Sequence, residues 1–224
     1  MVEHFDSSLV AEKILRIDLI PTWGEVCQFV KRLGKNEWVS FCRRYTLYNI
    51  ENLELVSGLA FVLRELPRPI IEVCAGRGKL SYWLRRFGID IIATDDYSWR
   101  LWGERHGVEK LDVWEALEKY SPRTVLGSWI PANASLGLAI LSHPTVEFFI
   151  DISEGPEGDT SWMHMFDYDT VREIAKKYGF RVIPLDFLSI WCISQLDEPL
   201  DNLLLRKTRV LLFARKEIPN IWIA

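Results

Sequence analysis

The sequence predicts an α/β fold with a mostly parallel, seven-stranded sheet that ends in an antiparallel hairpin. Residues 70–96 have the pattern of a buried strand, a glycine loop, an amphipathic helix, a second buried strand and a carboxylate. From residue 70 onward, strands and helices alternate, which is typical of a parallel sheet covered on both faces. Residues 181–194 and 207–216 read as two long strands with no helical segment between them, so they should pair antiparallel.

Length and composition favour one α/β domain with an appended segment. The chain has 224 residues, of which 49% are hydrophobic and 26% charged, a profile that can bury a sizeable core. Its net charge of −4 gives no overall attraction to phosphate backbones, so a nucleic-acid partner is not favoured. No apolar run approaches the roughly 20 residues that cross a bilayer, and no membrane association is expected.

The cysteines indicate a reducing compartment. Cys27, Cys42, Cys74 and Cys192 are widely spaced and form no Cys-x-x-Cys pair, so we expect buried apolar side chains instead of disulfides or a zinc site. No set of His, Asp and Glu residues has the spacing of metal ligands, and we predict no metal. The N-terminus lacks a signal-peptide pattern. The sequence therefore predicts a cytoplasmic protein.

Residues 1–66 are predicted to form a helical N-terminal extension to an α/β domain of residues 67–224. Thr22 and Glu25 match a capping box, in which each side chain serves an amide at the start of a helix. Gly34 separates this helix from the next helical segment. A third helix is indicated by apolar residues at helical spacing, Leu55, Leu59, Val62, Leu63 and Leu66. The extension either covers a cofactor or substrate cleft or serves as plain scaffold.

The strands of the α/β part are predicted from short apolar runs bounded by turn residues. In order, they cover residues 70–74, 89–94, 108–111, 124–129, 146–152, 181–194 and 207–216. The helix after the first strand buries one apolar face and ends at Gly88, and the next helix begins after Asp112 as its N-cap. Two further helices cover residues 133–142 and 167–178. An acidic turn around residues 197–201 joins the last two strands.

The loop after the first strand predicts a site for an adenosine-type cofactor. Gly76 and Gly78 let the backbone turn tightly and approach a ligand closely. Asp95 follows the second strand, 19 residues after Gly76, where a carboxylate can accept hydrogen bonds from two ribose hydroxyls. A dinucleotide fingerprint is only partly met, because Ser81 stands where its third glycine belongs. A phosphate-binding P-loop fails, because Val73 replaces its first glycine.

The form Glu72-x-x-Ala75-Gly76-x-Gly78 is similar to motif I of the class I S-adenosylmethionine-dependent methyltransferases. The resemblance covers about two-thirds of the chain and implies the Rossmann-like fold of that family, in which a sheet closed by an antiparallel hairpin is the rule. It implies S-adenosylmethionine as the cofactor. The backbone of residues Ala75, Gly76, Arg77 and Gly78 would contact the cofactor's amino-acid end, and Glu72 would help to satisfy its ammonium.

The resemblance also assigns the acids after the second and third strands. Asp95 would bind the ribose, with the adjacent Asp96 as a competitor for the same role or a helix-capping and solvent-exposed residue. Asp112 matches the position where the family often contacts the adenine amino group. A plain N-cap is an equally good interpretation of Asp112, and the two roles can coexist. Ser128, after the fourth strand, completes the predicted cofactor-binding set.

The methyl-transfer cleft should lie after the fourth strand. Trp129 and Pro131 are predicted to line it, unless residues 128–133 are simply a capped helix start. Amino-group methyltransferases often carry Asn/Asp-Pro-Pro-Tyr/Phe at this point. This chain has Ser-Trp-Ile-Pro, so nitrogen is not indicated as the acceptor atom. Glu154, after the fifth strand, is the best candidate for a general base or substrate anchor, and its alternative is a solvated loop acid.

Tryptophans gather near the predicted ligand-side loops, where an indole ring could stack on adenine or on a planar substrate. These are Trp99, Trp102, Trp129 and Trp162. Taken together, the sequence predicts a S-adenosylmethionine-dependent methyltransferase whose acceptor is an unidentified molecule, with a small molecule or a protein favoured. Two alternatives stay open. One is a nicotinamide-dependent oxidoreductase that uses the same glycine loop, and the other is a non-catalytic S-adenosylmethionine-binding protein.

Overall fold

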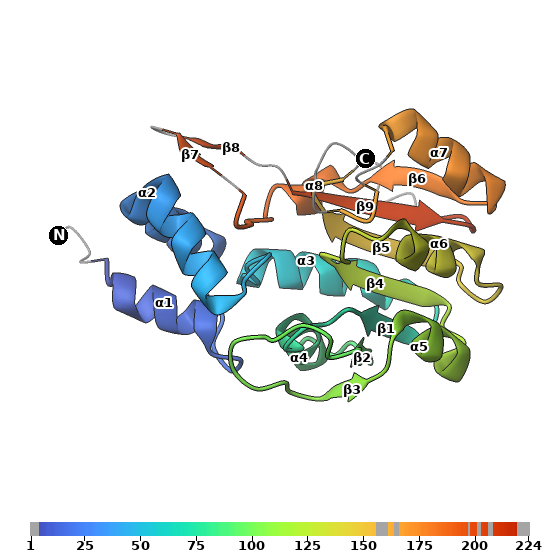
Figure 1. The fold of residues 1–224 in the computed structure, drawn as a ribbon, viewed down its shortest axis with the longest axis horizontal. Coiled ribbons are helices and arrows are strands. Elements are labelled where there is room, and N and C mark those ends of the chain that lie inside the picture. Colours follow the sequence, from blue (N-terminus) through green and yellow to red (C-terminus); the bar gives the residue numbers. More distant parts are fainter. Residues whose placement is uncertain are drawn as a thin grey trace.

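The computed structural model describes residues 5–155, 161–163, 166–196, 198–200, 203–205 and 208–218. Its centre is a seven-stranded sheet of order β3-β2-β1-β4-β5-β9-β6, drawn in Figure 1. The strands are β1 (Ile70–Val73), β2 (Ile92–Asp95), β3 (Val108–Lys110), β4 (Thr124–Ser128), β5 (Phe148–Ser153), β6 (Arg181–Pro184) and β9 (Arg209–Ala214). Residues 156–160 and 197, 201–202 and 206–207 lie outside the described residues.

The strand directions agree with the predicted fold class. β1 to β5 pair parallel, and β9 pairs antiparallel with both β5 and β6. The prediction of a mostly parallel seven-stranded sheet with an antiparallel end is confirmed. β1 and β4 are buried on both faces, as their continuous apolar runs require. Their carboxyl ends meet at one edge of the sheet, where ligands of open α/β sheets bind.

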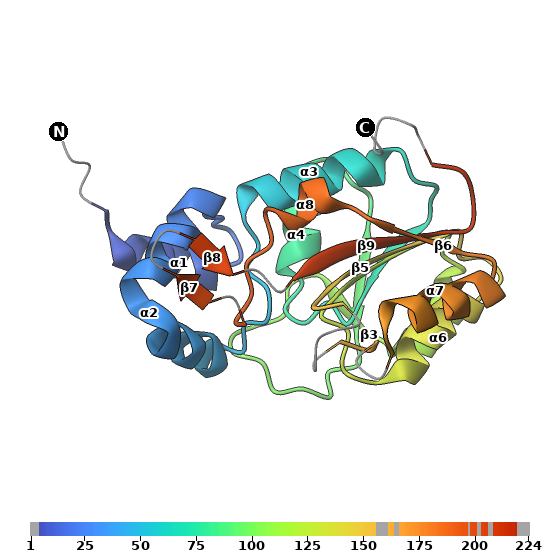
Figure 2. The same ribbon diagram turned by 90° about the horizontal axis from the view of Figure 1, so that it is seen from above.

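Helices cover both faces of the sheet, as Figure 2 shows. One face carries α3 (Leu53–Arg64), α4 (Lys79–Arg86) and the short α8 (Asp186–Ser189), whose apolar side chains share one core cluster with the sheet. The other face carries α5 (Val113–Tyr120), α6 (Ala134–Ser142) and α7 (Tyr168–Lys177) around a second cluster. The sequence analysis assigned α3 to the N-terminal extension, because it precedes the predicted boundary between residues 66 and 67. In the structure α3 shares a core cluster with the sheet, and the domain division stays a prediction.

The first two helices form a separate layer at one end of the sheet. α1 (Ser7–Leu15) and α2 (Trp23–Tyr45) pack around a third apolar cluster that contains the fully buried Trp38. The predicted capping box at the start of α2 is confirmed, because Thr22 and Glu25 serve each other's amides. The predicted break at Gly34 appears as a kink, where the backbone has φ 72°. The indole nitrogen of Trp38 donates to the carbonyl of Ser194 at 3.0 Å and ties this layer to the C-terminal half.

The prediction of one long strand over residues 181–194 is wrong. The strand ends at Pro184, and α8 follows it. Burial explains the change, because Leu185 and Leu188 are fully buried in this turn. The hydroxyl of Ser189 also stabilises it, donating to the carbonyl of Leu185 and accepting from the amide of Val210. A separate hairpin, β7 (Glu198–Leu200) and β8 (Leu203–Leu205), stands beside α2. The predicted acidic turn at residues 197–201 lies partly outside the described residues.

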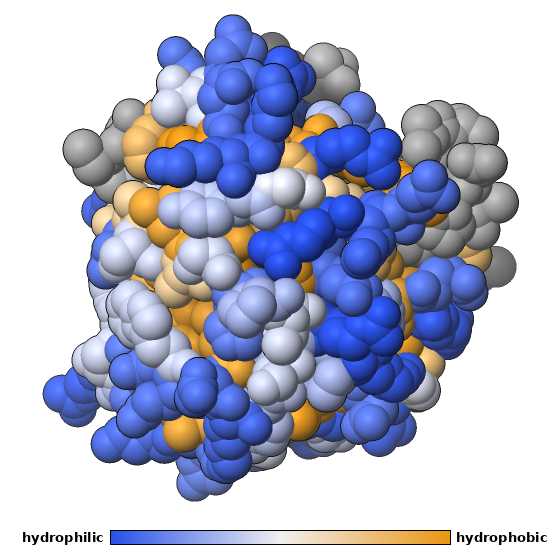
Figure 3. All heavy atoms as spheres, turned by 90° about the vertical axis from the view of Figure 1, so that its right-hand side faces the viewer, coloured by the Kyte–Doolittle hydropathy of each residue, from blue (hydrophilic) through white to orange (hydrophobic). Residues whose placement is uncertain are grey.

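The surface drawn in Figure 3 carries hydrophilic side chains over most of this face, with hydrophobic ones scattered between them. Across the described part of the chain, every helix is too short or too polar to cross a bilayer.

Candidate functional site

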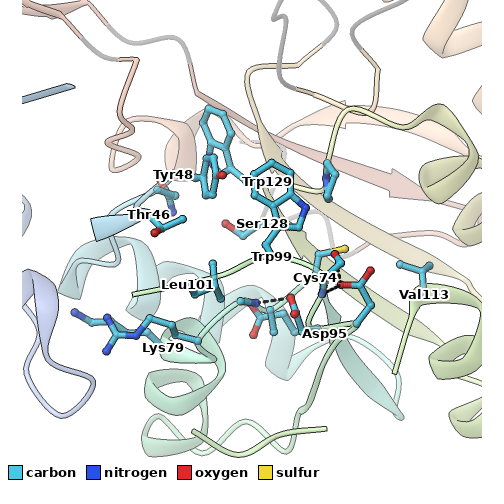
Figure 4. Close-up of a pocket in the computed structure, with 18 of the residues that line it drawn as sticks. Thr46, Tyr48, Cys74, Lys79, Asp95, Trp99, Leu101, Val113, Ser128 and Trp129 are labelled. Atoms are coloured by element: carbon cyan, nitrogen blue, oxygen red, sulfur yellow. Dashed lines mark hydrogen bonds between the residues drawn. The ribbon is translucent and has the colours of Figure 1, made fainter. Parts of the chain in front are cut away.

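A cavity of about 510 Å³ opens at the carboxyl ends of β1, β2 and β4. This volume falls within the range of small-molecule sites, about 300–1,000 Å³. Ten of the predicted site residues line it, namely Glu72, Ala75, Gly76, Arg77, Asp95, Asp96, Asp112, Ser128, Trp129 and Pro131. Gly78 and Glu154 are not among the lining residues. The topology therefore brings most of the predicted set to one place (Figure 4).

The glycine loop between β1 and α4 needs glycine at two positions. Gly76 and Gly78 have φ of 58° and 80°, in the left-handed region that other residues rarely adopt. A Cβ on Gly78 would lie 2.5 Å from Cγ2 of Val108 and 2.8 Å from the carbonyl oxygen of His106. Gly78 thus lets the loop pack directly against the start of β3. Its predicted contact with a cofactor stays a prediction, whereas Gly76 faces the cavity.

Asp95 is fixed at the end of β2 by the backbone around it. Its Oδ2 accepts from the Gly76 amide at 3.0 Å, and its Oδ1 accepts from the Tyr97 amide at 2.9 Å. The guanidinium of Arg105 lies 3.7 Å from Oδ1 and stacks over the ring of Tyr97. Each carboxylate oxygen can accept two hydrogen bonds, so both retain capacity for a ligand hydroxyl. The carboxylate links the glycine loop to the ribose position that the sequence predicts.

The other two acids at this edge have local roles as well. Asp112 forms a capping box with Glu115, accepting from its amide at 2.8 Å, so the N-cap interpretation of Asp112 is confirmed. Asp112 also lines the cavity, and its predicted contact with adenine is compatible with the cap. Asp96 accepts from the amide and hydroxyl of Ser98 in an exposed turn. The geometry leaves Asp95 the better-buried of the adjacent pair.

Charged side chains of both signs gather where α4 begins. Lys79 is buried. Its Nζ donates to the carbonyls of Lys13 and Ile14, in the last turn of α1, at 2.8 and 2.7 Å. Desolvation lowers the pKa of Lys79 to about 8, against the opposing attraction of Glu51. Arg77 donates to the carbonyl of Leu15 at 2.9 Å. α1 is thereby tied to the glycine loop, beside the cavity.

Two carboxyl groups lie beside these cations. Glu72 is buried in β1 and accepts from the amide and hydroxyl of Ser81. Desolvation, together with the nearby Glu51, raises the pKa of Glu72 to about 8. Desolvation also raises the pKa of Glu51, while Lys79 and Arg77 lower it. Glu51 lines the cavity, and the sequence analysis did not identify it.

Glu51 belongs to a short segment before α3 that forms one wall of the cavity. Residues 46–49 and Glu51 line it, opposite the glycine loop. The segment is held by Ile50, whose amide donates to the carbonyl of Ile193, and by Asn52, whose Nδ2 donates to the carbonyl of Trp191 at 2.7 Å. Both partners are about 140 residues away in the chain. In the sequence, the local feature of this segment is Asn52, which precedes the apolar residues of α3. An asparagine there predicts a helix cap and gives no indication of a binding site.

The wall after β4 is aromatic. Trp129 has a left-handed backbone (φ 59°), and its amide donates to the carbonyl of Ile152. Its ring stacks on Tyr48 with centroids 6.1 Å apart, and Trp99 meets Tyr48 edge-on at 6.2 Å. Among the four tryptophans singled out from the sequence, Trp99 and Trp129 line the cavity. Trp102 packs on Arg77, away from the lining set.

The fourth tryptophan and Glu154 lie around the end of β5. Trp162 is a core residue, and its indole nitrogen donates to the buried Asp151 at 3.1 Å. Desolvation raises the pKa of Asp151 to about 6. Glu154 follows Ser153 in the loop beyond β5 and is not among the lining residues, so its role as a base stays a prediction.

Among the described residues, no group of three or more His, Cys, Asp and Glu side chains is placed to hold a metal ion. The four cysteines are free thiols.

No protein-family model matches the sequence, and no curated protein is significantly similar to it. Solved structures do have a similar fold. Magnesium protoporphyrin IX methyltransferase from Synechocystis PCC 6803, with bound SAM, is 12% identical over 96% of this chain and 100% of that chain, with a TM-score of 0.47. A SAM-dependent O-methyltransferase from Thermotoga maritima is 12% identical over 82% of this chain and 72% of that chain, also at 0.47. A SAM-dependent methyltransferase from Archaeoglobus fulgidus is 13% identical over 84% and 98%, at 0.45.

Proposed function

We propose that this chain is a S-adenosylmethionine-dependent methyltransferase. Its acceptor is a small molecule or a protein side chain, which the cavity of about 510 Å³ can admit, and nucleic acid is disfavoured by the net charge of −4. The strand order, with its antiparallel β9, and the position of the cavity at the carboxyl ends of the strands support the proposal.

The observation that carries the proposal is the mixed charge beside the glycine loop. Arg77 and Lys79 offer positive charge for a carboxylate, and Glu51 and Glu72 offer partners for an ammonium. An amino-acid end with both groups fits this arrangement. A nicotinamide dinucleotide would instead place a pyrophosphate at this loop, and it would leave the carboxyl groups of Glu51 and Glu72 without an ammonium partner. The oxidoreductase alternative is therefore the weaker one.

S-adenosylmethionine, when bound, supplies a methyl group already activated on a sulfonium. The protein's part is alignment and the exclusion of water. Asp95 accepts hydrogen bonds from the ribose, Asp112 lies by the adenine, and Ala75, Gly76, Ser128 and their neighbours shape the cofactor's end of the cavity. Trp129 and Pro131 close the acceptor's end. Glu154 is proposed to receive the acceptor's proton or to anchor the acceptor.

The proposal includes the division of the chain. Residues 67–224 form the α/β domain, and the helical extension of residues 1–66 supplies Ile14 and the wall at 46–51 to the cavity. This supports the prediction that the extension covers the cleft. A cytoplasmic location is part of the same proposal and is supported by the wide spacing of the four cysteines.

Calorimetric titration tests the proposal directly. We expect S-adenosylhomocysteine to bind and NAD to bind far more weakly, and preferential binding of NAD would overturn it. Transfer of labelled methyl from S-adenosylmethionine to fractions of a cell extract then tests catalysis. Cofactor binding without transfer to any fraction would favour the non-catalytic alternative.

A further inference from the structure

The end of the cavity farthest from Asp95 has polar groups that nothing in the described structure satisfies. Asn49 lines the cavity and is only 6% exposed, yet neither its Oδ1 nor its Nδ2 has a hydrogen-bond partner among the described residues. The indole nitrogen of Trp129, 8% exposed, is also unpartnered there. Buried amide and indole groups in native proteins are normally hydrogen-bonded, so exceptions that line a cavity indicate a ligand.

Aromatic side chains lie beside these groups. Tyr48 precedes Asn49 and stacks on Trp129 at an interplanar angle of 28°, and Trp99 closes on Tyr48 from the side. Desolvation raises the pKa of Tyr48, so its hydroxyl stays neutral. In Figure 4, Tyr48 and Trp129 lie at the top of the view, and Lys79 and Asp95 lie at the bottom. Lys79 and Asp95 thus lie apart from the stacked rings of Tyr48 and Trp129.

We infer that this end binds an uncharged, planar aromatic acceptor whose edge carries a hydrogen-bond donor next to an acceptor, as in a lactam. A carboxamide presents one donor and one acceptor side by side, so Asn49 can pair with such an edge through two hydrogen bonds. The rings of Tyr48 and Trp129 supply flat surfaces for stacking. The inference rests on the proposed function, because it names the acceptor class of the same site.

The polar atoms of Asn49 and Trp129 are also out of reach of solvent. A ligand therefore meets them only after the neighbouring rings shift. The backbone of Trp129 is in the left-handed region, which is strained for a residue other than glycine. Strained residues of this kind are often found at ligand sites. Because the Asn49 side chain has no partner in the described structure, its removal should not weaken the fold.

Calorimetry with two ring systems tests the inference in the presence of saturating S-adenosylhomocysteine. The probes are carbostyril, which has a lactam edge, and N-methylcarbostyril, which lacks the N–H donor. We expect the wild-type protein to prefer carbostyril by about tenfold or more, since the methylated probe leaves a buried acceptor unpaired. Asn49→Leu should abolish that preference, and Trp129→Phe should weaken both probes. Asn36→Leu, an exposed change on α2, is the matched control and should preserve the preference.

Thermal unfolding separates binding from structure. Asn49→Leu should leave the melting temperature unchanged or raise it, because it removes an unsatisfied amide. A lower melting temperature, equal binding of both probes, or a preference that survives Asn49→Leu would each overturn the inference. If S-adenosylhomocysteine binds but neither probe does, the acceptor class is wrong while the proposed function stands. If S-adenosylhomocysteine itself fails to bind, both fall.

Discussion

The two ends of the cavity satisfy their polar groups to different degrees, although the Nε of Arg77 is unpartnered at the first end. At the glycine-loop end, Asp95 accepts two backbone amides, Glu72 accepts from Ser81, and Lys79 donates to two carbonyls. At the aromatic end, where Tyr48 stacks on Trp129, the amide of Asn49 and the indole nitrogen of Trp129 have no partner in the described part of the chain. Satisfied polar networks are rigid, whereas unsatisfied ones are costly unless a ligand completes them.

The difference indicates a division of labour. The first end is built in advance for a ligand of constant shape, because the carboxyl groups of Asp95 and Glu72 are already oriented by the chain. The second end derives its order from stacked rings, which adapt to a planar guest more easily than a hydrogen-bond network does. Substitutions at the first end should therefore damage folding and cofactor binding, and substitutions at the second end should change acceptor choice.

The largest effect is expected from Gly78→Val. The left-handed backbone costs a β-branched residue about 1–3 kcal/mol, and the clash with residues 106–108 costs about 1–3 kcal/mol more. We expect a large fall in the free energy of unfolding, measured by denaturant titration. Gly24→Ala is the control, since its Cβ meets nothing within 4 Å and it lies in a helix, so stability should rise slightly. Equal stability of wild type and Gly78→Val would show that the loop packs differently.

Cofactor affinity should respond most to Asp95→Ala. Hydrogen bonds to a charged group are worth about 1.5–3 kcal/mol each, so losing two to a ribose should weaken binding of S-adenosylhomocysteine about a hundredfold or more. The loop would also loosen, because Gly76 and Tyr97 lose their acceptor. The adjacent Asp96→Ala decides between the two acids in the same calorimetric assay. A greater loss in Asp96→Ala would move the ribose site.

Sequence alone predicted the end of the cavity that is built from local chain. The strand, glycine loop, helix, strand and carboxylate between residues 70 and 96 lie within one βαβ unit, so spacing fixes their relation. Caps at Thr22, Asp112 and Asn133 were also predictable, because a cap depends on three or four neighbouring residues. The sheet followed from the alternation of these units.

The other end was not predictable, because it is placed by distant contacts. Asn49 and Glu51 reach the cavity only because Asn52 and Ile50 bond to backbone at Trp191 and Ile193. No pattern in residues 46–51 predicts contact with residues 191 and 193. The error over residues 181–194 has the same origin, since the buried Leu188 packs against α3 and favours a helical turn where the local apolar pattern reads as strand.

Stability should fall as pH rises between about 6 and 7.5, and Glu72→Gln should flatten that dependence. The folded pKa of Glu72, about 8, exceeds the ordinary carboxyl value, so the folded state holds a proton that the unfolded state has released. Its contribution is complete below about pH 4.5 and is lost as pH approaches 8, with a slope of up to about 1.4 kcal/mol per pH unit.

Two other groups set the window for this measurement. Asp151, with a pKa raised to about 6, contributes in the same direction mainly at the lower end of this window, and Asp151→Asn is the matched control. Lys79, with a pKa lowered to about 8, acts in the opposite direction above that pH. Glu51, whose pKa is also raised, acts in the same direction as Glu72, so the contribution of Glu72 is the difference between wild type and Glu72→Gln in denaturant unfolding at pH 6 and 7.5. An unchanged slope in Glu72→Gln would show that its carboxyl group is ionised in the folded protein.

The smallest effect is expected from Glu154→Gln. A positioned general base contributes about a hundredfold or more to rate, but Glu154 lies outside the lining of the cavity. We expect turnover to slow by less than that, with cofactor affinity unchanged, because a transferred methyl group is already activated and the base only removes a proton. Methyl-transfer rates across pH measure this. A normal rate would remove Glu154 from the mechanism, and a hundredfold loss would mean that its carboxyl group reaches the acceptor during catalysis.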